Sequence, residues 1–368
     1  MPAPFIIAGA GISGLTLAGA LQRADRDVVV IEERPEVTGG GFGLALWPNA
    51  VAALDDLGLG DAVRHLAREV PVLTLLSSSG RVLRRLDETR LREALGGPPL
   101  AIRRGALVDL LQERLSPGTI RTGTAVVSHD HAPAGVDVRL SDGSELEGCA
   151  LVGADGYRSL VARRLGPLPE RYAGYPAWRG TAPVGGLEPV QVWGDRQLFG
   201  MVPLDGHTTY WFAARHEPAG GTAGIRHLRE VFAGWPEPVG MLLDVTPEEA
   251  VSCVDIMDRA LPRHWAEGRV VLLGDAAHPM RPHLAQGACQ ALVDVAVLAR
   301  LLDAHDPASA FATFEAQRRG TADRLVRASR VAGLVAGHRA LHRLAGLPPE
   351  SLLLRRLAAV AGRSAYRC

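Results

Sequence analysis

The segment Gly9-Ala10-Gly11-Ile12-Ser13-Gly14 constrains the fold of this chain more than any other feature. It follows the apolar run Phe5-Ile6-Ile7-Ala8 and opens a helical run over residues 15–23, so it lies where a strand turns into a helix. The first glycine allows the tight turn, the second lets the backbone approach a phosphate, and the third lets the helix pack on the strand. Because the N–H groups at a helix start can hold a pyrophosphate, the segment is predicted to bind a dinucleotide through Gly9, Gly11, Ser13 and Gly14.

The next apolar run, Val28-Val29-Val30-Ile31, ends at an acidic residue, Glu32. In a strand-helix-strand unit that binds a dinucleotide, an acid at the end of the second strand accepts hydrogen bonds from a ribose. Glu32 is therefore predicted to bind the adenosine ribose. Its register with the glycine segment favours a dinucleotide site over an ordinary glycine-rich loop.

Two later segments also follow apolar strands. Arg269-Val270-Val271-Leu272-Leu273 is followed by Gly274-Asp275, and Gly153-Ala154-Asp155-Gly156 follows another strand. A carboxylate at the C-terminal edge of a parallel sheet lies where ligands bind. For both aspartates a second interpretation is open, in which the carboxylate caps the helix that follows.

These three segments, in this order, resemble those of the class A flavoprotein monooxygenases of the para-hydroxybenzoate hydroxylase type. The resemblance covers nearly the whole chain, with further matches at 41–50, 102–107 and 175–180. The last of these, Tyr175-Pro176-Ala177-Trp178-Arg179-Gly180, looks most like the branch that contains salicylate, 3-hydroxybenzoate and urate hydroxylases and zeaxanthin epoxidase. The resemblance implies a non-covalently bound FAD, NADH or NADPH and O2 as co-substrates, and an aromatic or natural-product small molecule as the substrate.

The resemblance also implies roles for individual residues around the cofactor. Asp275 would hold the ribityl chain or the pyrophosphate of FAD, and Asp155 would lie near FAD and NAD(P)H together. A cationic fork suits phosphate oxygens, so Arg104 would lie near the pyrophosphate; its neighbour Arg103 is an alternative, and a solvated pair is another. Arg34 would lie over the adenine or be a surface charge. The other implied positions are Gly43, Gly274, Pro282, Gln286 and Gly287.

The loop over residues 282–287 matches the family loop that passes the isoalloxazine ring, and its last two residues start a helix that runs to residue 300. Backbone N–H groups at that helix start can stabilise negative charge on the flavin. The chain departs from the family pattern at Ala285, where glycine is frequent, and at Val293, where glutamate usually precedes Asp294. The first departure is expected to reshape the loop around the ring.

Arg179 and His283 are the candidate catalytic residues. A similar arginine contacts substrate in the urate hydroxylase branch, although a structural strand arginine is an open alternative. Where the urate hydroxylases carry an acid, His283 could accept a phenolic or ring proton near neutral pH, or could satisfy a carbonyl of its loop. His278 is expected to hydrogen bond within its turn, and His207 to be exposed at a hairpin tip. Side chains expected to line an apolar pocket are Val202, Leu204, Trp211 and Phe212.

The alternation of helical and strand patterns predicts an α/β fold. It comprises a Rossmann-like FAD-binding domain of the GR2 type, an interleaved substrate domain with an antiparallel sheet, and a C-terminal helical tail. Hairpins are predicted at 78–80, 142–143 and 205–207, and a long helix over 307–344. The predicted boundaries are 1–70, 98–168 and 260–305 for the FAD-binding domain, 71–97 and 169–259 for the substrate domain, and 306–368 for the C-terminal helices.

Composition narrows the functional class. The chain has 368 residues, of which 47% are hydrophobic, and its 40 basic and 40 acidic side chains give no net field that would attract nucleic acid or an anionic membrane. The four cysteines lack metal-ligand spacing, so unpaired thiols in a reducing cytoplasm and no metal site are expected. No run is predicted to span a membrane, and residues 351–360 are expected to form a helix that packs on the protein rather than on a lipid surface. The oligomeric state is left open between a monomer and a homodimer.

Three functions are compatible with these features. The leading prediction, which the resemblance implies, is hydroxylation of an aromatic or heteroaromatic small molecule with NAD(P)H and O2 through a C4a-hydroperoxyflavin. One alternative is epoxidation of an isoprenoid or polyketide olefin by the same intermediate. The other is a flavin-binding protein without turnover, against which the complete set of FAD motifs argues. Because a single Gly-x-Gly-x-x-Gly follows a strand, NAD(P)H is expected to bind transiently near Asp155 and not in a domain of its own.

Overall fold

The glycine segment begins at the end of an inner strand of a mostly parallel sheet. The computed structural model describes residues 3–40, 42–220, 224–338 and 349–366. The first sheet has the strand order β18-β19-β12-β1-β2-β8, and β1 runs parallel to both of its neighbours. The strands are β1 Phe5–Ala8, β2 Val28–Glu32, β8 Ile120–Thr122, β12 Ala150–Gly153, β18 Ala266–Glu267 and β19 Val270–Leu272.

Both faces of this sheet are covered, so its strands are apolar throughout instead of alternating with polar residues. Ile6 and Ile7 are both fully buried and point to opposite faces. The side chain of Ile7 lies beside α1 (Ile12–Arg23), whereas that of Ile6 lies against Gly148. The strands that cover the second face form a small antiparallel sheet: β9 Val126–Ala132, β10 Gly135–Leu140 and β11 Glu145–Gly148.

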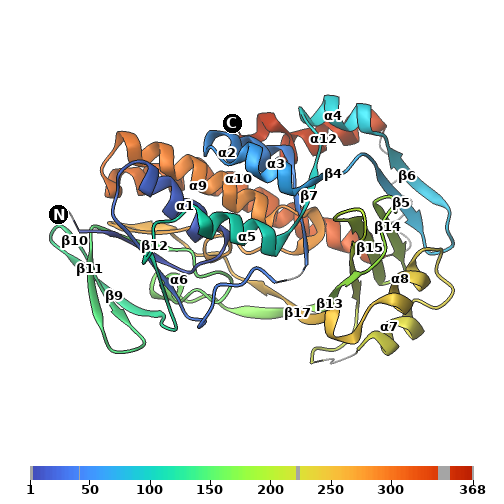
Figure 1. Cartoon of the computed structure of the whole chain (residues 1–368), viewed down its shortest axis with the longest axis horizontal. Helices are drawn as coiled ribbons and strands as arrows, with labels where there is room; N and C mark the ends of the chain where they lie inside the picture. Colours follow the sequence, from blue (N-terminus) through green and yellow to red (C-terminus); the bar gives the residue numbers. More distant parts are fainter. Residues whose placement is uncertain (1–2, 41, 221–223, 339–348, 367–368) are drawn as a thin grey trace.

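Helices far apart in sequence gather on the first face (Figure 1). α1 packs against α9, α9 packs against α2 and α10, and α5 packs against α1 and α3. The helices and the short sheet on this side are α2 Pro48–Asp56, α3 Gly60–Leu66, α5 Arg104–Glu113, α9 Gly287–Ala304, β3 Gly43–Leu46, β4 Arg68–Glu69 and β7 Leu100–Arg103. The small helix α6, Leu160–Arg164, follows β12 and packs against β9.

A second, seven-stranded sheet has the order β17-β13-β16-β15-β14-β5-β6. Its pairs are antiparallel except for β14 with β5, where the hairpin β5–β6 joins from an earlier part of the chain. The predicted hairpins over 78–80, 142–143 and 205–207 are all confirmed. The strands are β5 Leu73–Ser77, β6 Val82–Leu86, β13 Glu170–Ala182, β14 Val190–Gly194, β15 Gln197–Pro203, β16 Thr209–Arg215 and β17 Val251–Arg259.

Residues that alternate along these strands face two different environments. One face carries Trp178, Phe199 and Trp211, which form a core with the outer helices α7 (Ile225–Val231) and α8 (Val239–Val245). The other face carries Tyr175, Leu198 and Ala214 and packs toward α10. This second face is the one that turns toward the first sheet.

The C-terminal helices join the two sheets. α10 (Pro307–Gly337) contributes Phe311 and Phe314 to the core of the first sheet, and near its end contributes Ala336 to the core beside the second. α12 (Glu350–Ala361) packs on α4 (Glu88–Leu95), so the expected packing of 351–360 on the protein is confirmed. The predicted long helix is confirmed to residue 337, and residues 339–344 of that prediction lie outside the described residues.

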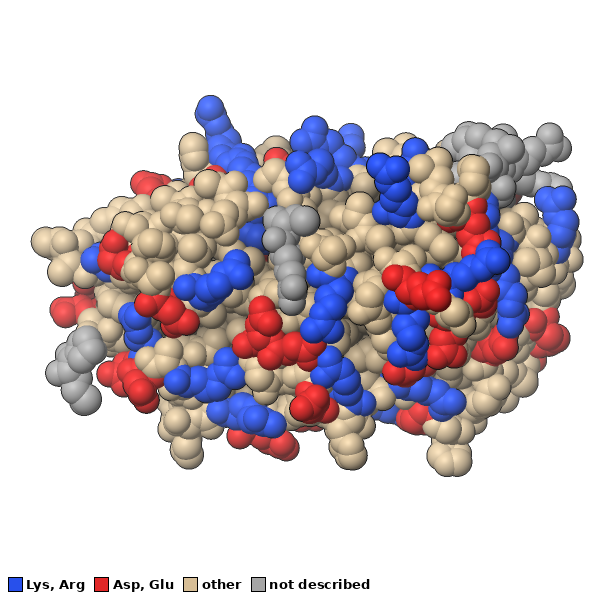
Figure 2. All heavy atoms as spheres, turned by 90° about the horizontal axis from the view of Figure 1, so that it is seen from above, with Lys and Arg blue, Asp and Glu red and all other residues tan. Residues whose placement is uncertain are grey.

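The α/β fold class with C-terminal helices is confirmed, while the division into domains stays a prediction. Four short 3-10 helices complete the described elements: η1 Glu248–Ala250, η2 Gly274–Ala276, η3 Pro282–Leu284 and η4 Arg363–Tyr366. No helix among the described residues is long and apolar enough to cross a membrane. Basic and acidic side chains are interspersed over the face shown in Figure 2.

Candidate active site

The three glycines of the first segment have different structural roles. Gly9 has φ +99°, and a Cβ added there would lie 2.5 Å from the carbonyl oxygen of Ala154. A Cβ on Gly14 would lie 2.0 Å from the carbonyl oxygen of Gly9, so helix α1 approaches the loop as closely as backbone allows. By contrast, a Cβ on Gly11 would meet nothing within 4 Å. Gly11 therefore borders open space at the helix N-terminus, as a phosphate cradle requires.

The carboxylate of Glu32 lies beside this loop. Its Oε2 accepts a hydrogen bond of 2.8 Å from the backbone N–H of Ala10, and its Oε1 accepts one of 3.1 Å from the N–H of Arg34. These bonds fix the acid at the mouth of the glycine loop. Its predicted contact with a ribose stays a prediction.

Segments separated by most of the chain meet at this loop. A Cβ on Gly274, which has φ +55°, would lie 2.6 Å from Oγ of Ser13. A Cβ on Gly287 would lie 3.9 Å from Oδ1 of Asp275, and one on Gly9 would lie 2.9 Å from Cα of Asp155. The fold therefore gathers four predicted segments at the N-terminal ends of α1 and α9.

Asp275 presents a carboxylate that no described residue hydrogen bonds, and no cap bond links it to a helix. The residue is exposed at the surface of the structure, and the protein around it displaces water and raises the pKa of its carboxyl, while His278, Arg259 and Arg104 oppose the rise. The capping interpretation of Asp275 is therefore wrong.

Arg104 is the first residue of α5 and points to the same region. It donates a hydrogen bond of 2.7 Å to the carbonyl oxygen of Gly39. Burial lowers the pKa of its guanidinium, as do the neighbouring charges of Arg34 and Arg179, while Asp275 raises it. Three arginines and one aspartate thus lie within electrostatic reach of one another.

Arg103 is committed elsewhere. Its guanidinium donates to Oδ2 of Asp205 and to Oγ1 of Thr208, both at 2.8 Å. Of the two adjacent arginines, Arg104 is therefore the one whose charge acts on Asp275.

Asp155 has one committed oxygen and one without a partner. Its Oδ2 accepts hydrogen bonds from the N–H groups of Leu160 at 2.8 Å and Val161 at 3.2 Å, which is the capping interpretation. Its Oδ1 is buried without a partner among the described residues, and burial raises the pKa of this carboxyl. Capping and a further contact are both compatible with this geometry.

The loop before α9 contains strained backbone. Ala285 adopts φ +49° and ψ +35°, a left-handed conformation that favours glycine, which accounts for the glycine frequent at this position in the family. The next residue, Gln286, is 1% exposed; its Oε1 accepts from Asn49 at 3.0 Å and from Gln290 at 2.9 Å. Its Nε2 has no hydrogen-bond partner in the described part of the chain, so a buried donor is available beside the loop.

A buried ionic cluster supports the Gly274 turn. Oδ2 of Asp294 accepts a 3.1 Å hydrogen bond from the N–H of Gly274 and lies 2.5 Å from Nε2 of His278. Its Oδ1 accepts a 2.8 Å bond from Nε of Arg318. His278 hydrogen bonds within its turn, as expected, through its backbone N–H, which donates to the carbonyl oxygen of Gly274 at 2.8 Å. Its ring bonds Asp294 of α9 in addition, because α9 passes directly behind the turn. The sequence signal for this cluster is the lone acid within the apolar run 291–298.

His283 lies between the loop and the second sheet. Its Nε2 lies 2.8 Å from the hydroxyl of Tyr175. Its ring packs directly on Gly333 of α10, where an added Cβ would lie 2.6 Å from the ring. Burial, with the charges of Arg281 and His216, lowers the pKa of His283 to about 4. The ring is therefore uncharged near neutral pH. It is a weaker base than the sequence prediction assumed.

The second sheet turns Arg179, Tyr210 and Phe212 toward the first sheet. Arg179 is half-buried, and within the described ranges it makes no hydrogen bond and no ion pair. The rings of Tyr210 and Phe212 lie 6.0 Å apart, and Tyr210 packs against Gly43 of β3. Polar and aromatic groups thus line this face together.

Two pocket expectations have different outcomes. Trp211 is fully buried among the side chains under α7 and α8 and donates to Thr246, so its placement in the pocket was wrong; alternation along β16 turns it away. Val202 and Leu204 pack with Tyr210 on the opposite face.

His207 is exposed at its hairpin tip, as predicted.

Comparisons with known proteins decide the family. The family described as FAD binding domain matches residues 3–329. The chain belongs to the class A FAD-dependent monooxygenases. It is 39% identical over 323 residues to an aurachin C monooxygenase/isomerase from Stigmatella aurantiaca, covering 85% of this chain and 84% of that one. It is 34% identical to a 3-amino-4-hydroxybenzoate 2-monooxygenase from Streptomyces cremeus, covering 85% and 82%.

A solved structure agrees with this membership. Klebsiella pneumoniae HpxO, complexed with FAD and uric acid, superposes with a TM-score of 0.90 at 26% identity and covers 97% of this chain and 96% of its own. The α/β fold, the enzymatic class and the FAD cofactor predicted from the sequence are thereby confirmed.

The residues of this monooxygenase fit an FAD. The open space at Gly11 suits a phosphate, the unbonded carboxylate of Asp275 suits hydroxyl donors, and the free Nε2 of Gln286 suits a flavin acceptor. Arg104 supplies a cation in the same region. When bound, FAD supplies electron transfer and activation of O2.

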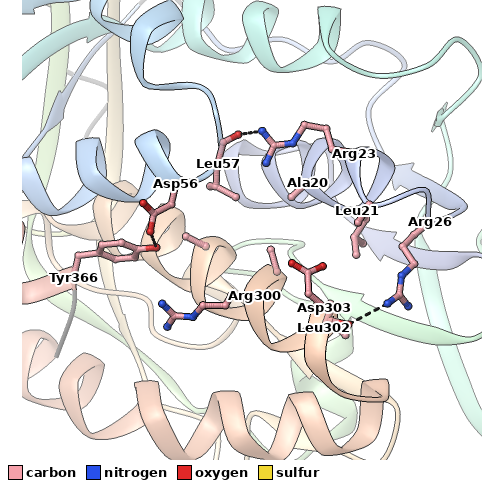
Figure 3. A pocket seen from close by; sticks show the side chains of 13 residues that line it. Ala20, Leu21, Arg23, Arg26, Asp56, Leu57, Arg300, Leu302, Asp303 and Tyr366 are labelled. Atoms are coloured by element: carbon pink, nitrogen blue, oxygen red, sulfur yellow. Dashed lines mark hydrogen bonds between the residues drawn. The ribbon is translucent and has the colours of Figure 1, made fainter.

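A cavity of about 390 Å³ lies beside the C-terminal ends of α1 and α9, whereas the candidate FAD site lies at their N-terminal ends. Figure 3 shows the residues that line this cavity. It is bordered by Arg23 and Arg26 near the end of α1, by Arg300 near the end of α9 and by Tyr366. α1 spans about 18 Å at 1.5 Å per residue, so the cavity is distant from the glycine loop. Arginines at helix C-termini have an ordinary role there, because they complement the helix dipoles.

Proposed function

We propose that this monooxygenase hydroxylates an aromatic or heteroaromatic small molecule with NAD(P)H and O2, in the space between the FAD segments and the second sheet. The observation that carries the proposal is Arg179, a half-buried cation without a described partner on the face turned toward the FAD segments. The relatives named after 3-amino-4-hydroxybenzoate and uric acid support an aromatic substrate class.

Arg179 binds a negative substituent of the ring, such as a carboxylate or phenolate. A charge-assisted bond from guanidinium to such an oxygen fixes the ring in one orientation. Because negative charge on an oxygen substituent makes a ring more electron-rich, the same contact favours transfer of an electrophilic oxygen atom. Arg179 therefore acts in binding and in orientation.

Tyr210 and Phe212 hold the faces of the substrate ring and exclude water. Aromatic side chains supply large apolar area with preferred stacking geometries. Water exclusion matters because the activated oxygen would otherwise be lost as peroxide. Leu204 and Val202 extend the apolar wall.

His283 acts as an acceptor that orients the hydroxyl of Tyr175 and is not a base matched to neutral pH. Its low pKa and its bond to that hydroxyl support this role. The variant His283→Asn tests it: product yield is expected to fall without a shift of the pH profile near neutrality. A pH profile that loses an ionisation near neutrality in this variant would restore the role of base.

NAD(P)H binds transiently near Asp155, between the three-part FAD-binding domain and the substrate domain. The buried Oδ1 of Asp155 without a described partner supports a further contact there. Anaerobic stopped-flow reduction should show weak nicotinamide binding and rates that depend on the substrate. Tight binding of NAD(P)H to the oxidised enzyme alone would contradict this.

The proposal is tested with the FAD-loaded protein, a substrate panel and 18O2. The panel contains aromatic carboxylates and phenols, neutral aromatic compounds and isoprenoid olefins. The expected result is oxidation of NAD(P)H stimulated by anionic aromatics, with one 18O atom in a hydroxylated product. An 18O-labelled epoxide from an olefin would instead establish epoxidation, and peroxide formation alone with every compound would contradict both.

A further inference from the structure

Arg259 is a buried arginine directly behind the Gly274-Asp275 turn. It is the last residue of β17 and is 2% exposed. One terminal nitrogen donates to the carbonyl oxygens of Asp275 at 3.0 Å and of Ala276 at 2.6 Å, and the other donates to the carbonyl of Tyr157 at 2.6 Å. A single guanidinium thus ties together two of the predicted FAD segments.

The charge of Arg259 has no directly bonded counterion. In the part of the chain that the structure describes, no carboxylate lies within ion-pair distance of it, and its Nε has no acceptor. A buried cation is costly unless hydrogen bonds and nearby negative charge compensate it. Carbonyl oxygens supply the hydrogen bonds, and the carboxylates of Asp275, Glu170 and Asp155 supply negative charge that acts on it.

We propose that Arg259 is a positioning residue for FAD: it fixes the backbone of the turn that carries Asp275 and places a positive charge behind that carboxylate. The proposal rests on the proposed function and on the contact between Asp275 and FAD that the family resemblance implies. The charge faces the turn from β17, a strand of the second sheet, so Arg259 also couples the second sheet to the cofactor site.

The charged groups around Asp275 set the expected dependence on pH. Arg259 faces it from β17, Arg104 from α5 and His278 from the end of its own turn, while α9 presents the uncharged Gly287. Each of these three groups opposes the rise of the pKa of Asp275 that the loss of water around it causes. Without the charge of Arg259 this pKa rises further, so protonation, and with it loss of FAD affinity, sets in at higher pH.

The test measures the dissociation constant of FAD for the apoprotein by flavin fluorescence, from acidic to neutral pH. Arg259→Gln is expected to weaken binding by about 10- to 100-fold at neutral pH, since hydrogen bonds from a charged donor are lost. The pH at which affinity falls is expected to move upward. Arg259→Lys keeps the charge with fewer donors, so it is expected to weaken binding without moving that pH.

Arg229→Gln is the matched control. Arg229 donates to the carbonyl oxygens of Leu243 and Asp244 at 3.2 and 3.1 Å in the outer helices, remote from Asp275. It is expected to bind FAD as the wild type does. An Arg259→Gln protein with wild-type affinity and an unchanged pH dependence overturns the proposal. Weaker binding with an unmoved pH dependence refutes the role of the charge.

Asp275→Asn separates the role of Arg259 from the implied contact of Asp275 with FAD, while the proposed hydroxylation is tested independently by product formation. If Asp275→Asn binds FAD as tightly as the wild type, the contact of Asp275 with FAD fails. If Asp275→Asn weakens binding and Arg259→Gln does not, the proposed role of Arg259 fails and the contact of Asp275 with FAD stands. If Arg259→Gln does not fold, Arg259→Lys decides the outcome, because wild-type affinity in that variant overturns the role of its hydrogen bonds.

Discussion

The FAD segments and the substrate-facing surface of the second sheet are built on different principles. In the first region, backbone meets backbone: a Cβ on Gly14 would lie 2.0 Å from a carbonyl oxygen, and Asp294 is fully enclosed by its partners. In the second, side chains such as Arg179, Tyr210 and Phe212 are half-buried. In the first region the fold excludes a larger residue wherever backbone meets backbone, as at Gly9 and Gly14, whereas in the second a substitution can change specificity without loss of the fold.

This contrast separates two kinds of mutational effect. Substitutions at buried positions that pack the FAD segments, such as Asp294 and Gly14, should lower the free energy of unfolding. Substitutions on the substrate-facing surface should alter substrate preference and leave that free energy nearly unchanged, because surface-lining positions make few obligatory contacts.

The largest expected loss follows Asp294→Asn. The change leaves Arg318 as a buried cation without a carboxylate, so the free energy of unfolding should fall by about 3–5 kcal/mol. Chemical denaturation of the apoprotein near neutral pH measures it. Asp303→Asn, an exposed acid on the same helix, is the control and should match the wild type. Equal stability of both variants would show that the cluster is not supporting the fold.

The effect of Asp294→Asn should depend on pH. Burial disfavours the charge of Asp294, but His278 and Arg318 outweigh it and lower the pKa below that of an unfolded aspartate, about 3.9. A lowered folded pKa means that the stabilisation is complete above the unfolded value and is lost as the pH falls through the folded value. The difference between variant and wild type should therefore shrink in acid.

A somewhat smaller loss is expected for Gly14→Ala. The added methyl group would overlap the carbonyl oxygen of Gly9, and displacement of α1 should cost about 3 kcal/mol. Gly19→Ala on the same helix is the control, because its Cβ would lie 3.7 Å from a leucine methyl group. There the better helix propensity of alanine should add about 0.5–1 kcal/mol. Urea unfolding should show a lower free energy of unfolding for Gly14→Ala and a higher one for Gly19→Ala. Wild-type stability in both variants would contradict the close packing of α1 on the loop.

On the substrate-facing surface, Arg179→Met should reduce kcat/KM for anionic aromatic substrates by about 10- to 100-fold, the value of a charge-assisted hydrogen bond. Neutral substrates should be affected little, and apoprotein stability should not change. Arg171→Met, on the same strand with a side chain 75% exposed, is the control. Loss of stability without a change of preference would assign Arg179 a structural role.

The smallest effect is expected for Ala285→Gly. Alanine at φ +49° is strained by about 1–2 kcal/mol, and glycine relieves that strain at some entropic cost in the unfolded chain, so a net gain of about 0.5–1 kcal/mol is expected. Thermal unfolding of the apoprotein measures it. Ala288→Gly, within α9, should lower stability by a similar amount. A loss of stability in both variants would mean that the loop is not strained.

What the sequence predicted also follows this contrast. Gly9 and Gly14 were recognisable because tight backbone contacts favour glycine there, Gly274 because its φ of +55° does, and the strands around them were apolar enough to identify. Arg259 and Arg318 were missed, because an arginine that donates to distant carbonyls or acids has no local signature. Trp211 was assigned to the wrong face. Both faces of this sheet are packed against other elements, so aromatic residues occur on both and do not identify the face that lines the pocket.

Gly11 offers the most direct measurement, because its position tests FAD binding without disturbing the fold. Its φ of −81° and ψ of −176° are accessible to alanine, and a Cβ there would meet nothing within 4 Å. Gly11→Ala apoprotein should therefore melt as the wild type does, while its affinity for FAD, measured by equilibrium titration, should fall by about 100-fold because the methyl group occupies the space for the phosphates. Wild-type affinity for FAD in this variant would contradict the placement of the cofactor at the glycine loop.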